Sequence, residues 1–194
     1  EIRVERLDGI PAIFGHLQKA RIQTTIDKVI ETHGNWQGLS PGWVITSWLI
    51  HILSAHTHCM DRVQEWGAKR VHGLQQLTGQ PLTALDFTAD RLALCLQMLS
   101  QTDSWFEIEA QRGRHLLRGY QLKEEPTVRL DATTGTVNHD PDAHPLFKVG
   151  KAKNGQYETP YKMMLASLDP MGLALAVDIA AGNRADDPLY LPCY

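Results

Sequence analysis

Cysteine is scarce in this chain and poorly placed for cross-linking. The 194 residues contain three cysteines, Cys59, Cys95 and Cys193, and no two of them form a Cys-x-x-Cys pair. An odd and widely spaced set argues against a disulfide framework and against a zinc knuckle. We therefore expect the thiols to be reduced.

Long apolar runs are also missing. The nearest approach is "WVITSWLIHILSA" (43–55), which carries His51 and is too short to span a bilayer. The N-terminus lacks the basic, apolar and small-residue order of a secretion signal. We therefore predict a cytoplasmic protein with no membrane partner.

The chain has no excess of basic residues. Lysine and arginine total 19 against 22 acidic residues, which gives a net charge of −3. A globally basic surface is thereby excluded, and any contact with nucleic acid must be local. Hydrophobic residues make up 43% of the chain, enough for a globular core.

The first half has helical periodicity. Between about residues 10 and 118, apolar residues return every three or four positions. Ser40 and Pro41 suit the N-cap and first position of a helix that continues through 43–55. That helix is apolar on nearly all sides, so we place it at the centre of a helical N-terminal domain, residues 1–120.

The second half has the period of β-strands. A polar segment ending in proline, 119–126, precedes three predicted strands at 127–137, 161–168 and 173–181. The "DPMG" turn signal joins the last two into an antiparallel hairpin. The predicted fold class is therefore α+β.

The first strand contains an unexpected acidic residue. Alternation places Arg129, Asp131 and Thr133 on one face and the apolar residues on the other. Aspartate is uncommon in strands. Taken alone, Asp131 is either a solvated carboxylate at a sheet edge or a group held for chemistry, and the first reading is the better one.

Several features follow one another along the chain. A helical half precedes the strand with "LDATT", and then come a basic loop "GKAKNGQYETPYK", a hairpin "MMLASLDPMGLALAVDIAAGN" and the helix start "GNRADD". Together they resemble the DDE-class insertion-element transposases of the IS-four superfamily. The resemblance is specific in 128–188 and looser in the helical half.

The resemblance implies a ribonuclease H-like catalytic domain, of which residues 127–194 would be the first part. It makes Asp131 the first catalytic and metal-binding carboxylate, with Mg2+ as cofactor and terminal inverted repeats of DNA as substrate. DNA strand cleavage and transfer would be the activity of the complete protein. The helical domain would bind DNA ends or form a homodimer.

The family also needs a second Asp and a Glu, which would lie beyond residue 194. Phosphodiester chemistry of this kind uses two metal ions about 3.5–4 Å apart, and Mg2+ takes carboxylate ligands held on rigid elements. Asp178, on an alanine-rich strand face, is better explained by solvent exposure than as the second carboxylate. We therefore expect a fragment that is catalytically incomplete.

Three lysines, Lys148, Lys151 and Lys153, cluster in the glycine-containing loop. They are candidate nucleic-acid-binding residues, since phosphate contacts supply much of the affinity for DNA, but a solvated basic loop is an equal alternative. Two other functions stay open. The chain could be a truncated, non-catalytic DNA-binding or interaction protein derived from an insertion element, or an unrelated small α+β enzyme.

Overall fold

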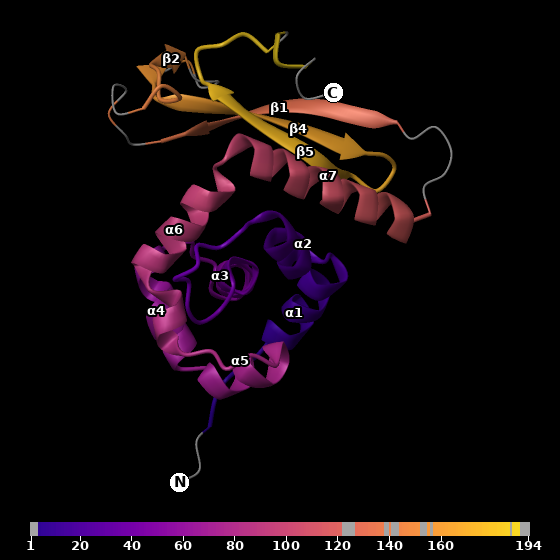
Figure 1. Ribbon diagram of the computed structural model, residues 1–194. Helices are drawn as coiled ribbons and strands as arrows, with labels where there is room; N and C mark the ends of the chain where they lie inside the picture. The colour runs from indigo at the N-terminus through magenta and orange to yellow at the C-terminus, as the bar shows by residue number, and fades with distance from the viewer. Residues whose placement is uncertain are drawn as a thin grey trace. The chain divides into compact units, whose positions relative to one another are not determined.

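The computed structural model describes residues 4–121, 127–137, 140, 144–151, 155, 157–186 and 188–190. The chain divides into two compact units, Glu1–His115 and Leu116–Tyr194. The first is helical, and the second contains a three-stranded antiparallel sheet (Figure 1). The predicted α+β class is confirmed. Of the expected domain boundary, 122–126 lie outside the described residues.

Unit 1 is built from short helices. They are α1 (Ile10–Lys19), α2 (Ile22–Val29), α3 (Pro41–Ala55), α4 (Val63–Ala68), α5 (Val71–Thr78) and α6 (Ala89–Leu99), with two 3-10 turns, η1 (Met60–Arg62) and η2 (Ala84–Phe87). The last helix, α7 (Thr102–Gly119), begins in unit 1 and ends in unit 2. Among the residues that the structure describes, no helix has the length and apolar character that crossing a bilayer requires.

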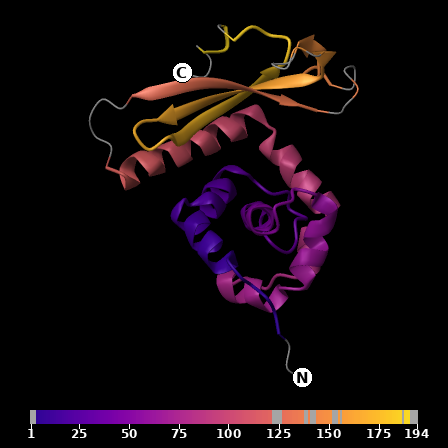
Figure 2. The same cartoon turned by 180° about the vertical axis from the view of Figure 1, so that it is seen from behind.

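Helix α3 forms the centre of unit 1. Figures 1 and 2 show it encircled by α1, α2, α4, α5 and α6. Val44 and Ile50 are fully buried, and His51 is 1% exposed. As predicted, Ser40 is the N-cap, its hydroxyl accepting from the Trp43 backbone N–H, and Pro41 is the first helical residue. A helix that is apolar all round needs neighbours on every side, and here it has them.

Asp27 joins α2 to the start of α3. Its carboxylate accepts hydrogen bonds from Gln23 Nε2 (2.5 Å), the Ser40 hydroxyl (2.5 Å) and the Gly42 backbone N–H (2.6 Å). A Cβ at Gly42 would lie 2.4 Å from the Gln23 carbonyl oxygen, so only glycine allows this approach. The entry to the central helix is therefore fixed by one half-buried acid and one glycine.

The sheet of unit 2 has the order β1-β4-β5. Its strands are β1 (Val128–Thr136), β4 (Pro160–Leu168) and β5 (Leu173–Ala181), and both neighbouring pairs are antiparallel. A small second sheet pairs β2 (Gly150–Lys151) with β3 (Tyr157–Glu158). The predicted antiparallel hairpin is confirmed.

The two faces of the sheet differ in character. One face forms the core of unit 2, made by β4 and its neighbours with Leu189 from the segment that follows β5: Met164, Ala166, Ala180 and Leu189 are buried, and Val128, Leu130 and Ala132 pack against them. The other face carries the alternate residues of each strand. The predicted alternation in the first strand is confirmed, since Val128, Leu130 and Ala132 lie on the core side.

Candidate functional site

Asp131 lies near the middle of β1, as the fourth of nine residues. It is exposed, and it faces Leu165 of β4, which in turn faces Val177 of β5. Its place on a strand paired with 160–168, itself paired with 173–181, is the arrangement that the sequence predicts. Within the described part of the chain, its carboxylate has no hydrogen-bond or ion-pair partner, so it is available to a ligand.

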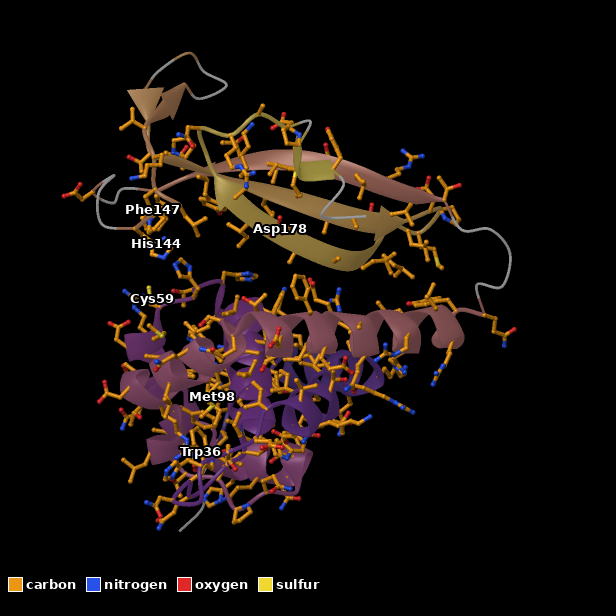
Figure 3. The ribbon with its side chains drawn as sticks, turned by 45° about the horizontal axis from the view of Figure 1, so that its top comes forward. Trp36, Cys59, Met98, His144, Phe147 and Asp178 are labelled. Atoms are coloured by element: carbon orange, nitrogen blue, oxygen red, sulfur yellow. The ribbon has the colours of Figure 1, made fainter. Side chains whose placement is uncertain are left out.

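Asp178 points away from Asp131. In the strand register Asp178 is paired with Met164, which points to the core side, whereas Asp131 is paired with Leu165, which points to the other side. The two carboxylates therefore lie on opposite faces of the sheet. Asp178 is exposed and projects from β5 (Figure 3), and its carboxylate accepts from the Ile179 backbone N–H at 2.9 Å. The two acids cannot share a metal ion.

Two other described acids near the sheet have partners of their own. Asp169 accepts from Arg129 Nε at 2.5 Å, and Asp186 pairs with Lys162. The Arg129 pKa is raised by its hydrogen bond to Asp169 and by the charge of that carboxylate. Across the described ranges, no three His, Cys, Asp or Glu side chains form a group that could hold a metal ion. Asp131 therefore offers one ligand, and these residues do not form a Mg2+ site by themselves.

Gly150, in the segment that carries the three lysines, lies at the end of the sheet where β1 finishes. A Cβ at Gly150 would lie 3.2 Å from Cγ of Pro160 and 3.5 Å from the Gly182 carbonyl oxygen, and Pro160 pairs with Thr136, the last residue of β1. Thr136 lies five positions after Asp131, a distance of about 17 Å along the strand. A DNA backbone that reached both would have to run along β1.

Of the three lysines, only Lys148 has a described side chain, and it is half-buried. Lys151 lies in β2, but its side chain is not among the described ones, and Lys153 lies outside the described residues. Ahead of Lys148, the rings of His144 and Phe147 are 5.5 Å apart (Figure 3). Contact of these lysines with phosphate stays a prediction.

Unit 1 contains two hollows that the sequence analysis did not find. One, of about 420 Å³, lies beside Trp36, where the Arg91 guanidinium sits 4.4 Å from the ring centroid. The other, of about 490 Å³, lies between α1, α2 and α3, with Trp43 in its wall. Trp48 and Trp66 are buried, but Trp36 and Trp43 are half-buried and line these hollows.

Known proteins give no further guidance. No protein-family model, no curated protein and no solved structure matches the chain. A functional assignment therefore has to be argued from the residues of the site.

Proposed function

We propose that the chain is the N-terminal portion of a DDE transposase, with unit 2 as the first part of a ribonuclease H-like catalytic domain. The proposal depends on one observation above all. Asp131 is an exposed, unpartnered carboxylate near the middle of the first strand of an antiparallel sheet, within the described part of the chain. The sequence features "LDATT" and "GNRADD" supply the family resemblance.

The chemistry of the position supports this role. Aspartate is disfavoured in strands, and within the described residues Asp131 makes no contact that would compensate. A carboxylate on a paired strand is held in a fixed direction, which is what a metal ligand requires. In the complete protein, Asp131 would supply one ligand to Mg2+, which would polarise the scissile phosphate and activate the attacking oxygen.

The free edge of β1 also supports the proposal. Among the described residues β1 pairs only with β4, so its other edge has unpaired backbone groups. A further strand on that edge would lie about 4.8 Å from β1 and could bring a second carboxylate beside Asp131. The other neighbouring position is already taken by β4, whose residue opposite Asp131 is Leu165.

The substrate of the proposed transposase is DNA, at the terminal inverted repeats of its element. Lys148, Lys151 and Lys153 would contact phosphates of the DNA strand that leads to Asp131. Unit 1 would bind DNA ends or form a homodimer. The exposed cation Lys28 on α2 is suited to backbone contacts of low sequence specificity.

The decisive experiment uses the complete open reading frame that contains this chain. A marker flanked by the element's own ends is placed on a plasmid, and excision is measured with wild-type protein and with Asp131→Asn and Asp178→Asn. We expect Asp131→Asn to abolish excision while DNA binding persists, and Asp178→Asn to leave excision near the wild-type rate. Asp178 is the matched control because it is an exposed strand aspartate on the opposite face.

Two outcomes would contradict the proposal. One is unchanged excision by Asp131→Asn. The other is a complete product that binds the ends but never cuts them, which would favour the non-catalytic DNA-binding protein instead.

A further inference from the structure

The larger hollow in unit 1 has the size of a small-molecule site. Its volume is about 490 Å³, and ligand pockets typically enclose about 300–1,000 Å³. The wall combines apolar and aromatic surface, from Leu17 and Trp43, with amides, hydroxyls and one cation. Every wall residue belongs to unit 1, so this site is independent of Asp131.

The cation in the wall is Arg21, between α1 and α2. Its side chain is exposed, and within the described residues its guanidinium has no ion-pair or hydrogen-bond partner. No aspartate or glutamate lines the hollow. An unpaired guanidinium is well suited to bidentate binding of a phosphate. One end of the hollow is therefore suited to an anion.

A second and independent sign of a ligand comes from Thr46 of α3. This wall residue is 1% exposed, and its Oγ1 has no hydrogen-bond partner. Buried hydroxyls are nearly always paired, because an unpaired one loses its bonds to water without replacement. Rotation about the Cα–Cβ bond can bring the hydroxyl to the position that the methyl group holds, so a polar ligand in the hollow could supply the missing partner.

The remaining wall groups suit a flat ring with hydrogen-bonding edges. Trp43 is held in place by Phe14, with ring centroids 6.2 Å apart and planes inclined by 20°. Gln23 donates its Nε2 hydrogen to Asp27 at 2.5 Å, which leaves its carbonyl oxygen as an oriented acceptor. Aromatic rings stack on nucleobases, and glutamine side chains bind base edges.

We propose that this hollow binds one nucleotide unit, with its base against Trp43, its polar edge at Gln23 and Thr46, and its phosphate at Arg21. The nucleotide could come from solution or from a single strand of DNA. The proposal goes beyond the transposase assignment and does not depend on it, since it involves no residue of unit 2.

The test measures binding of nucleoside 5′-monophosphates to the 194-residue chain by isothermal titration calorimetry. The corresponding nucleosides and inorganic phosphate serve as separate probes. Arg21→Asn should weaken monophosphate binding by about ten- to a hundredfold, as expected for the loss of a charged hydrogen bond, and leave nucleoside binding unchanged. Arg21 has φ 55°, a left-handed conformation that asparagine tolerates.

Lys19→Asn is the matched control, because it removes one exposed positive charge two residues away without altering the wall. It should leave the affinity within about twofold, as expected for a cation that makes no direct contact. Thr46→Val, which keeps the shape and removes the hydroxyl, should weaken nucleosides and monophosphates alike. Circular dichroism of each variant checks that unit 1 is folded.

Three results would overturn the proposal: no saturable binding of any monophosphate, equal weakening by Arg21→Asn and Lys19→Asn, or inorganic phosphate binding as tightly as the nucleotides. A further arm identifies the source of the nucleotide. Competition by a single-stranded oligonucleotide without terminal phosphates would assign the site to DNA, and absence of competition would assign it to free nucleotides.

Discussion

Asp131 and Asp178 lie on β1 and β5, the two strands that flank β4, one register position apart and on opposite faces of the sheet in unit 2. On β4, Leu165 is the register partner of Asp131 and the adjacent residue Met164 is the register partner of Asp178. Adjacent residues of a strand point to opposite faces of the sheet. Their carboxylates therefore point to opposite sides of the sheet and cannot bind the same ligand. Any metal-dependent chemistry at Asp131 has to recruit its other ligands from elsewhere than β5.

The first prediction concerns the isolated chain. We expect the purified 194-residue protein not to cut or join DNA with Mg2+, because the described residues contain no group of three His, Cys, Asp or Glu side chains that could hold a metal ion. Nicking of supercoiled plasmid, followed on agarose gels with Mg2+ and with EDTA, provides the measurement. Mg2+-dependent nicking that Asp131→Ala removes would show that the chain carries a complete site.

A second prediction concerns the stability of unit 2. Asp131→Thr should leave the free energy of unfolding unchanged or raise it by up to about 1 kcal/mol, because a β-former replaces an exposed, unpartnered aspartate in a strand. Urea denaturation followed by far-ultraviolet circular dichroism measures the change. A loss of more than about 1 kcal/mol would indicate that Asp131 has a structural role after all.

Asp27 provides the third prediction. Asp27→Ala should lower the free energy of unfolding of unit 1 by about 2–4 kcal/mol, because the Gly42 N–H and the Ser40 hydroxyl both lose a charged acceptor. Lys28→Ala, at the exposed neighbouring position, should stay within about 0.5 kcal/mol of wild type. Tryptophan fluorescence in urea reports on both variants, and equal effects at the two positions would contradict the role given to Asp27.

The fourth prediction is a pH dependence of unit 1. Burial, assisted by the charge of Arg70, lowers the pKa of His51 below its ordinary value of 6.5. The unfolded chain therefore binds a proton at a pH where the folded chain does not, and stability should fall as the pH drops below about 6.5, by at most about 1.4 kcal/mol per pH unit from this residue. Above that pH, His51 makes its full contribution to the free energy of unfolding.

Thermal melts between about pH 5 and pH 7.5 check this dependence. His51→Leu should flatten it, because the leucine cannot take up a proton and also removes the unpaired Nδ1. His72→Gln, which changes an exposed histidine, should keep the wild-type slope. A steep slope that survives His51→Leu would assign the effect to other groups.

The fifth prediction concerns the lysine loop. Each phosphate contact contributes about one unit to the slope of log affinity against log salt. Replacing Lys148, Lys151 and Lys153 with alanine should therefore reduce the slope by up to about three units. Fluorescence anisotropy with labelled duplex DNA at several salt concentrations gives the slope. If the triple variant kept the wild-type slope, the DNA contacts would have to be sought in unit 1.

Local signals in the sequence predicted the elements on which they act directly. Ser40 and Pro41 define a helix start because both effects operate within one turn, and the alternation from Val128 to Thr133 defines the faces of β1 because strand periodicity is local. Asp131 could be predicted as a strand residue for the same reason. Its partners could not, since they depend on which strand pairs with β1 and in what register.

The larger hollow in unit 1 could not be predicted from local sequence signals. Its wall joins Leu17, Arg21 and Thr46, which come from different elements and meet only after the helices pack. In the sequence, Trp43 lies in an apolar run and looks like any core residue. Asp27 and Gly42 hold α2 against the start of α3, and no periodicity in the chain encodes how closely these two helices approach.

Within the described ranges one edge of β1 has no partner strand, and this has a practical consequence for handling the protein. Unpaired strand edges are sites where a second chain can add by main-chain hydrogen bonding, and proteins usually protect them with charge, proline or a covering segment. On β1 the interior residues of the described strand include one acid and one arginine but no proline. Asp131 would then also limit self-association of the 194-residue chain. Variants that neutralise it should therefore be prepared at low concentration, with light scattering to separate loss of solubility from loss of activity.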